Sequence, residues 1–223
     1  MDLSPIWLTL KLAAITTVIL AVIGVPVAWW LSKKRSLIKI IIEALITMPL
    51  VLPPSVLGFY LLLAFSPQRG LGKWLHDVFN VQFVFSFNGL VLASVIYSLP
   101  FMISPVKSAF QQLPQSLSQA SYTLGKSQWQ TFIKVLLPNI KPSLLTATVL
   151  TFAHTLGEFG VVLMIGGNIP GVTRVASIAV YDSVEQMDYT AANNYSLILF
   201  AITFVMVFSV FIYNKYQVKS PLE

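Results

Sequence analysis

Two ionisable residues, His154 and Glu158, stand four positions apart in an otherwise apolar segment. In a helix this spacing places both side chains on one face, where they could bind a metal ion or carry a proton. Two ligands do not make a metal site, and the sequence has no H-E-x-x-H motif, so we predict that no metal is bound. Because ionisable groups are costly against lipid, the pair either lies on a functional pathway or joins two helices by a mutual hydrogen bond.

Motifs for enzyme chemistry are missing from the rest of the chain. There is no cysteine and no G-x-S-x-G sequence, and we find no constellation for nucleophilic catalysis. The stretch from Ala120 to Ser127 differs by one residue from the phosphate-binding pattern G-x-x-x-x-G-K-[ST], but Ala120 replaces its first glycine and no strand-like run precedes it. We therefore predict that the chain is not an enzyme and binds no cofactor.

The composition is that of an integral membrane protein. Of 223 residues, 56% are hydrophobic and 10% are charged, and the mean hydropathy is +0.78. This leaves too little polar surface to cover a soluble domain. Five apolar runs are each long enough for a tilted spanning helix. We predict one all-α membrane domain, residues 1–223, with five transmembrane helices at residues 6–31, 37–65, 87–106, 143–165 and 195–213.

Basic residues predict the orientation of these spans, since cytoplasmic loops are enriched in Lys and Arg. Arg69, Lys73 and Arg174 fall on one side of the five spans, and ten basic residues fall on the other. This places the N-terminus outside and the C-terminus in the cytoplasm. Because these residues flank spans and do not form one soluble face, we predict no nucleic-acid partner. The ten are Lys33, Lys34, Arg35, Lys39, Lys107, Lys126, Lys134, Lys141, Lys215 and Lys219.

The second apolar run contains a proline cluster, Pro49, Pro53 and Pro54. Each proline lacks a backbone donor and clashes with the preceding turn, which excludes a straight helix. In lipid such a break is tolerated where neighbouring helices or a water-lined cavity surround it. The cluster is either a bend that lines a pathway or a kink in a packing helix. Glu43, near the start of the same run, is expected to reach the membrane interface.

A polar, basic segment, residues 107–141, separates the third and fourth runs and is predicted to be a cytoplasmic loop of two helices. In the first helix a narrow stripe contains small residues at its centre, which would let another surface approach the backbone closely. Gly125 is predicted to end this helix as a carboxyl cap. The stripe comprises Leu113, Leu117, Ala120, Ser121 and Leu124.

The second loop helix is predicted to run from Ser127, a plausible cap, to Leu137. Apolar residues recur in it at helical spacing, so one face should lie against the bilayer interface or the helix bundle. Pro138 is expected to end the helix.

The loop also contains a spaced motif. Gln119-Ala120-Ser121, three further residues, Gly125, nine more and then Val135 to Pro138 follow the pattern E-A-A-x-x-x-G-x9-I-x-L-P. The chain thereby resembles the permeases of type I ATP-binding-cassette importers, in which this loop couples to the ATPase. Gln119 replaces the usual Glu and removes a charge. The resemblance implies that the coupling residues are Leu117, Gln119, Ala120, Ser121, Leu124, Gly125, Lys126 and Pro138.

Two further stretches resemble the oxyanion branch of this family, most closely its molybdate permeases. One is P-L-V-L-P-P-S-V-L-G, from Pro49 to Gly58. The other is L-G-E-F-G, from Leu156 to Gly160, followed by G-N-I-P-G-V-T, from Gly167 to Thr173. The second stretch is also similar to sulfate and thiosulfate permeases, so such a permease is the alternative. A more remote alternative is a proton-coupled secondary carrier.

The resemblance implies a homodimer in the bacterial inner membrane that moves molybdate or tungstate by alternating access. Its implied partners are two cytoplasmic ATPase subunits, which use ATP and Mg, and a periplasmic oxyanion-binding protein. Glu158 is expected to be paired and not to face the anion. The candidate residues of the translocation pathway are Pro49, Pro53, Pro54, His154, Glu158 and Arg174.

Overall fold

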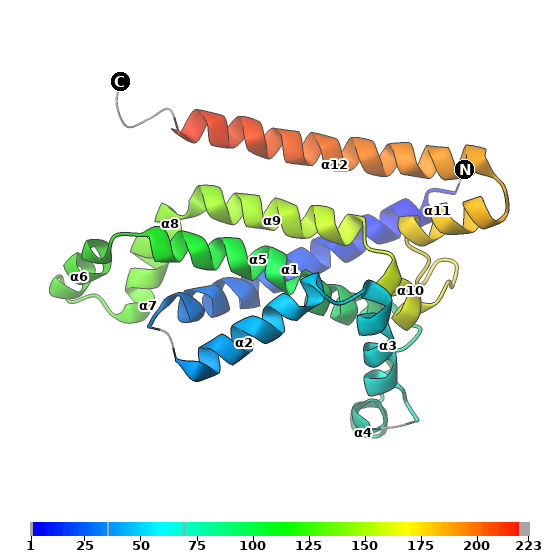
Figure 1. The fold of residues 1–223 in the computed structure, drawn as a ribbon, viewed down its shortest axis with the longest axis horizontal. Coiled ribbons are helices and arrows are strands. Elements are labelled where there is room, and N and C mark those ends of the chain that lie inside the picture. Colours follow the sequence, from blue (N-terminus) through cyan, green and yellow to red (C-terminus); the bar gives the residue numbers. More distant parts are fainter. Residues whose placement is uncertain (1, 35, 69, 219–223) are drawn as a thin grey trace.

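The computed structural model describes residues 2–34, 36–68 and 70–218, and this part of the chain is helical without a strand. Arg35, Arg69 and Lys219, which entered the topology prediction, lie outside the described residues. The start of α1 and the end of α12 lie at opposite ends of an elongated bundle (Figure 1). The elements are α1 (Ser4–Ser32), α2 (Leu37–Thr47), a 3₁₀ turn η1 (Met48–Leu50), α3 (Pro54–Phe65), α4 (Gly70–Phe79), α5 (Phe87–Gln112), α6 (Gln115–Thr123), α7 (Gln128–Thr131), a π-helical turn η2 (Phe132–Leu136), α8 (Leu137–Asn139), α9 (Lys141–Leu156), α10 (Gly160–Gly166), α11 (Ala176–Glu185) and α12 (Tyr189–Val218).

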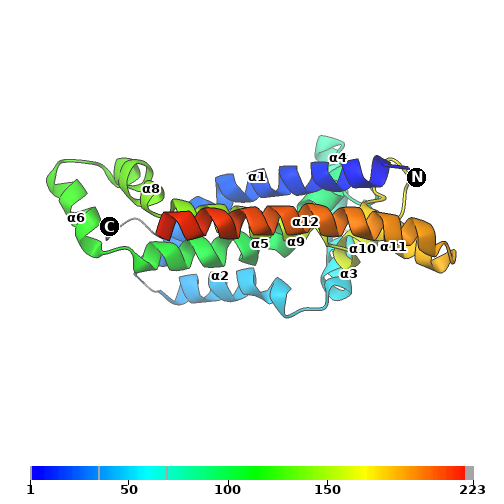
Figure 2. The ribbon, with the colours of Figure 1, turned by 90° about the horizontal axis from the view of Figure 1, so that it is seen from above.

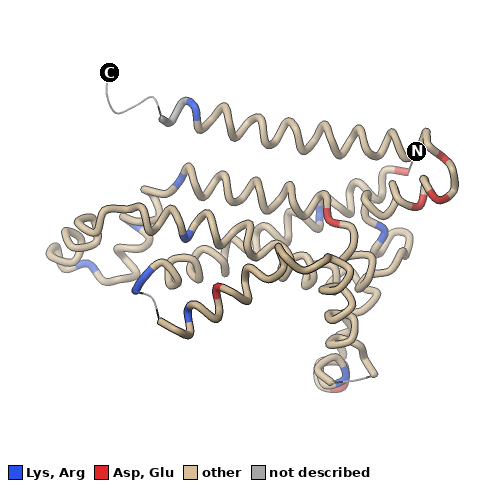
Figure 3. Tube along the Cα trace, in the orientation of Figure 1, with Lys and Arg blue, Asp and Glu red and all other residues tan. Residues whose placement is uncertain are grey.

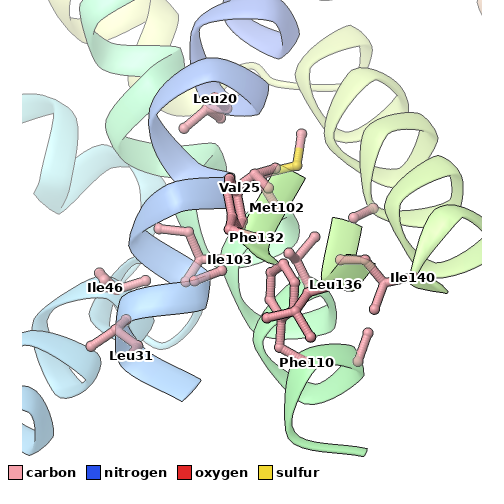
Figure 4. Close-up of a cluster of buried hydrophobic side chains, with 14 residues drawn as sticks. Leu20, Val25, Leu31, Ile46, Met102, Ile103, Phe110, Phe132, Leu136 and Ile140 are labelled. Atoms are coloured by element: carbon pink, nitrogen blue, oxygen red, sulfur yellow. The ribbon is translucent and has the colours of Figure 1, made fainter. Parts of the chain in front are cut away.

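Helices α1, α5 and α9 pack along one another and form the centre of the bundle (Figures 1 and 2). Helix α12 packs on α9 and α11, but little of its surface is buried, which suits a helix that faces lipid. At the end of the bundle near α6, the central helices enclose a hydrophobic cluster that also includes η2 (Figure 4). Its labelled members are Leu20, Val25, Leu31, Ile46, Met102, Ile103, Phe110, Phe132, Leu136 and Ile140.

The long apolar helices agree with a membrane protein. Helices α1, α5 and α12 are each long and apolar enough to cross a membrane. Two bent pairs also meet this test: α2–η1 with α3, bent by 114°, and α7–α8 with α9, bent by 80°. The described chain therefore offers three straight spans, or up to five if each bent pair crosses once. The first bend lies at the proline cluster, where a break was predicted.

The fourth predicted span is interrupted. Helix α9 ends at Leu156 and α10 begins at Gly160, so the prediction of one helix over residues 143–165 is wrong. Gly157 and Gly160 flank the break, and glycine is a poor helix former because it loses the most backbone freedom. The apolar composition of the run was read correctly, but its continuity was not.

The second loop helix begins where predicted and ends later. Ser127 Oγ accepts a hydrogen bond from Gln130 N, and Gln130 Oε1 accepts one from Ser127 N, both at 3.2 Å, which forms a capping box. Pro138 does not end the helix. It lies inside the continuous helical segment Gln128–Asn139, two residues after the π-helical turn.

Charged residues separate along the bundle. Lys and Arg gather towards the end that carries α6 and the end of α12, and most Asp and Glu lie towards the end that carries the start of α1 and α11 (Figure 3). The central part between these ends is largely uncharged, as expected for the region in contact with hydrocarbon.

Candidate functional site

The two interrupted segments meet at one cavity of about 640 Å³. Three of the predicted pathway residues, Pro54, His154 and Glu158, line it together. Ser55 from the start of α3 and Tyr97 from α5 line it as well, and sequence reasoning missed both. The complete lining is Pro54, Ser55, Tyr97, Ala153, His154, Gly157, Glu158, Phe159 and Gly160.

Glycines bring α3 and α10 into close contact beside this cavity. A Cβ atom at Gly58 would lie 2.7 Å from Met164 Cβ, and one at Gly160 would lie 2.9 Å from Pro54 Cβ. Ordinary side chains do not fit at such distances in a closely packed interior. The proline segment and the L-G-E-F-G segment therefore hold each other in place.

His154 is held by α5. Its Nδ1 atom lies 3.0 Å from Ser98 Oγ, and its ring stacks on Phe101 with the ring centroids 3.9 Å apart. The ring of Tyr97 lies 5.0 Å away, centroid to centroid. The alternative of a mutual hydrogen bond between His154 and Glu158 is therefore wrong. The ring of His154 is fixed at the cavity wall by contacts from one neighbouring helix.

Glu158 is buried and unpaired. Its exposed fraction is 5%, and neither carboxyl oxygen has a hydrogen-bond partner among the described residues. The Ser94 hydroxyl lies close by without a hydrogen bond of acceptable geometry. The Glu158 backbone carbonyl accepts a 2.6 Å hydrogen bond from Ser177 Oγ, which ties the break to α11. The expectation that Glu158 is paired is therefore wrong within the described part of this chain. Burying an unpaired carboxyl group costs free energy, so its presence calls for an explanation.

The other predicted pathway residues lie outside the cavity. Arg174, in the connection between α10 and α11, forms an ion pair with Asp182 at 3.2 Å and donates a 2.7 Å hydrogen bond to Asn168. Pro49 is buried in η1, and Pro53 precedes α3 on the surface. No three His, Asp or Glu residues in the described ranges come together as metal ligands.

Helix α6 projects from one end of the bundle (Figure 2), and several of its residues are exposed. Gln119 and Ala120 are exposed, and Leu124 keeps 78% of its surface accessible. Ser121 is buried instead, with its hydroxyl 2.8 Å from that of Thr131 in α7. The predicted stripe is therefore divided: Ser121 anchors α6 to α7, and Ala120 and Leu124 face outward.

The end of α6 has the predicted left-handed cap. Gly125 has a φ of +72°, and its N–H donates to the Tyr122 carbonyl at 2.9 Å. The next N–H, from Lys126, donates to the Ser121 carbonyl at 3.1 Å, so the last carbonyls of the helix are satisfied. The remaining predicted coupling residues are Lys126, exposed after the cap, Leu117, half-buried on α6, and Pro138, exposed on α8.

Lys107 does not lie in a loop. Helix α5 continues to Gln112, and Lys107 is buried within it, where it forms an ion pair with Glu43 of α2. The two residues are 64 positions apart, so nothing in the local sequence signals the pairing. That Glu43 reaches the membrane interface stays a prediction, and the structure adds that its partner is a buried lysine.

Sequence comparison assigns this architecture to a family. Residues 12–221 match the family described as "Binding-protein-dependent transport system inner membrane component". The chain belongs to this family. It is thus a permease subunit of an ATP-binding-cassette importer, which confirms the resemblance seen in the loop motif.

Individual relatives and a solved structure agree with this assignment. The chain is 44% identical over 216 residues to the molybdenum transport system permease protein ModB of Azotobacter vinelandii. This match covers 97% of this chain and 96% of that protein. It is 34% identical over 211 residues to a probable sulfate transport system permease protein, cysT, of Chlorella vulgaris. That match covers 95% of this chain and 78% of the relative. The fold matches a chain in the crystal structure of a bacterial alginate ABC transporter in complex with an alginate pentasaccharide-bound periplasmic protein. The TM-score is 0.77 and the sequence identity is 16%. The match covers 99% of this chain and 80% of that chain.

Proposed function

We propose that this permease imports molybdate, or the closely similar tungstate, by alternating access in a homodimer. The observation that supports molybdate as the substrate is the 44% identity over 97% of the chain to the molybdenum permease of Azotobacter vinelandii. The likeness to the sulfate permease of Chlorella vulgaris is weaker, at 34% over 95% of the chain. A sulfate or thiosulfate permease is therefore the alternative, and it requires no change in fold.

The exposed surface of α6 is the proposed docking site for the ATPase. Ala120 and the protruding Leu124 suit insertion into a cleft, because a small residue lets the helix approach and an exposed leucine gains from burial. Each protomer of the homodimer would engage one ATPase subunit, which binds the ATP and Mg²⁺. Closure of the ATPase pair would then shift the permease from an inward-open to an outward-open population.

A continuous set of contacts supports this coupling. Ser121 of α6 pairs with Thr131 of α7, and the next residue, Phe132, stacks on Trp29 of α1 with ring centroids 4.6 Å apart. Phe132 also contacts Phe110 near the end of α5, at 5.9 Å between centroids. A displacement of α6 would therefore reach α1 and α5 through packed side chains and not through a flexible linker.

The cavity lined by His154 and Glu158 is the proposed section of the translocation pathway. The described part of one chain offers at most five spans, too few to enclose a polar route, so a second copy would supply the opposite wall. Ser55 and His154 provide hydrogen-bonding groups for a tetrahedral oxyanion at the wall of the cavity. Arg174 lies at the other end of α10, where an anion released by a periplasmic binding protein would enter.

The proposed orientation places the α6 end in the cytoplasm and the end with α11 and the start of α1 in the periplasm. The gathering of Lys and Arg towards the α6 end supports it, because basic residues are retained on the cytoplasmic side (Figure 3). Five crossings, with each bent pair counted once, put the two termini on opposite sides.

Deletion of this chain tests the substrate. We expect loss of high-affinity molybdate uptake and of molybdoenzyme activity at trace molybdate, with rescue by high external molybdate. Growth on limiting sulfate should be unaffected, and plasmid-borne wild-type protein should restore uptake. Sulfur auxotrophy with intact molybdoenzymes would move the assignment to sulfate without disturbing the family.

A matched pair of surface variants tests the docking site. Leu124 and Met187 are both 78% exposed, and they lie at opposite ends of the bundle. Leu124→Asp should abolish co-purification of the ATPase while leaving the amount of permease in the membrane unchanged. Met187→Asp should retain the ATPase, and aspartate tolerates the positive φ of 59° at that position. Equal recovery of the ATPase with both variants would exclude α6 as the docking site.

A further inference from the structure

A second cavity, of about 580 Å³, lies at the α6 end of the bundle, away from the proposed pathway. It is formed where the ends of α1 and α5 face α6 and the start of α7. Of the predicted coupling residues, Gln119 lines it, whereas Ala120 and Leu124, which face outward, do not. Its walls are Trp29, Ser32, Lys33, Lys34, Phe110, Gln111, Leu113, Pro114, Gln115, Ser118, Gln119, Tyr122, Gln128 and Leu136.

The chemistry of these walls favours an anion. Two lysines line the cavity, and none of its described lining residues is acidic. The Lys33 ammonium lies 3.7 Å from the centre of the Trp29 ring and donates a 3.3 Å hydrogen bond to Gln128 Oε1. Partial burial, and to a lesser extent the charge of Lys39, lower the pKa of Lys33 below its ordinary value. The ammonium thus has aromatic and amide neighbours but no counter-ion among the described residues.

The position of the cavity matches the level of lipid headgroups. The cavity begins where the apolar run of α1 ends, at Trp29. Tryptophan side chains are enriched at the boundary between hydrocarbon and water. Trp30 and Trp129 are 42% and 55% exposed there. The α2 helix that follows in the chain starts with Leu37 and Ile38, exposed by 73% and 67%, which offer an apolar surface for acyl chains.

We propose that this cavity binds the phosphate-bearing headgroup of an anionic phospholipid, held by Lys33 and Lys34. Basic pockets between spanning helices on the cytoplasmic side recognise such headgroups, because a negatively charged leaflet and clustered ammonium groups attract each other. The bound lipid would fill the space between α1 and α6. It would thereby brace the helix that we propose to contact the ATPase. The binding itself depends neither on the transported substrate nor on the direction of transport.

Native mass spectrometry of the full-length protein, in complex with its ATPase, tests this site. The complex is exposed to phosphatidylglycerol or to phosphatidylcholine of the same acyl chains. We expect selective retention of phosphatidylglycerol, and a drop of about tenfold in its occupancy for the double variant Lys33→Gln/Lys34→Gln. Lys141→Gln/Lys215→Gln removes the same charge from exposed positions at the same end of the bundle and should retain the lipid. Thermal unfolding of both double variants checks that the fold is intact.

Three results would overturn the proposal. Equal loss of phosphatidylglycerol from both double variants would mean that the overall positive charge at this end of the bundle attracts the lipid, and not this cavity. Displacement by excess inorganic phosphate would mean that the cavity takes a free anion without the lipid. Retention by the permease alone but not by the complex would mean that the ATPase covers the cavity. All three leave the proposed transport function untouched, since that is measured by uptake.

Discussion

The ion pair between Glu43 and Lys107 predicts an asymmetric response to mutation. The Lys107 side chain keeps 11% of its surface exposed, whereas the Glu43 side chain keeps 44%. Glu43→Gln leaves a buried ammonium without its counter-charge. Lys107→Met removes the buried charge and leaves a half-exposed carboxylate at the predicted membrane interface, where water can reach it. We therefore expect the Glu43 substitution to destabilise the fold more than the Lys107 substitution, although both break the same pair.

The magnitude follows from the two exposures. Removing one partner of a fully buried pair costs about 3–5 kcal/mol, and the half-exposed Glu43 reduces this, so we expect about 2 kcal/mol for Glu43→Gln. Lys107→Met should cost about 1 kcal/mol or less, because methionine fills the space of the lysine stem and a carboxylate at the predicted membrane interface stays solvated. The double variant should resemble Lys107→Met, since no buried charge remains.

Thermal unfolding of the purified permease in one detergent, followed by tryptophan fluorescence, measures these differences. For a chain of 223 residues, a loss of about 2 kcal/mol corresponds to roughly 4–8 °C in Tm. Lys134→Met, at an exposed position, is the control for removing a positive charge and should leave Tm unchanged. Equal losses from the two single variants, or additive losses in the double variant, would refute the reasoning.

Three further predictions concern the docking helix, the bend and the orientation. Gly125→Val should lower recovery of the ATPase, because a β-branched residue at a φ of +72° is strained by about 1 kcal/mol or more; Gly157→Ala, at a φ of −90°, should recover it normally. Replacing Pro49, Pro53 and Pro54 together by Ala should leave the membrane yield similar and slow molybdate uptake, because hydropathy governs insertion and the prolines shape the 114° bend; wild-type uptake would reduce the bend to packing. The chain has no cysteine, so Lys126→Cys and Gln186→Cys each introduce its only thiol. An impermeant reagent should label the first only from the cytoplasm and the second only from outside, and labelling of both from one side would overturn the orientation.

Local features of this fold could be predicted from the sequence because short-range physics determines them. The cap at Ser127 needs Gln130 three residues later, and the left-handed end of α6 needs a glycine at one position. The break at Pro49 to Pro54 follows from the missing donors of proline alone. In each case the residues that decide the structure lie within one or two turns of one another.

Long-range pairings could not be predicted in this way. Ser98, the partner of His154, lies 56 positions away, and Lys107, the partner of Glu43, lies 64 positions away. Which helix faces which is set by the packing of α1, α5 and α9, and periodicity within one helix does not contain that information. Serine 98 is an ordinary residue in an apolar run, so its sequence context offered no signal.

The interruption after α9 is an intermediate case. Gly157 and Gly160 flank Glu158 in an apolar run, and this spacing could have signalled a break. Hydropathy averaged over a window does not register it, because two glycines and one acid hardly change the mean. A reading that weighed backbone propensity as well as hydropathy would have divided the run at Gly157.

The two breaks are best understood as one structural feature. Non-helical backbone at membrane depth persists only where other parts of the protein or a water-lined cavity surround it. Here each break supplies the surroundings of the other, since Pro54 at the start of α3 lies against Gly160 at the start of α10 and both line one cavity with Glu158. A larger residue at Gly160 would collide with Pro54 and Ser55 and push these segments apart. The prolines of one segment and the glycines of the other therefore act together, and a change in either should alter the same cavity.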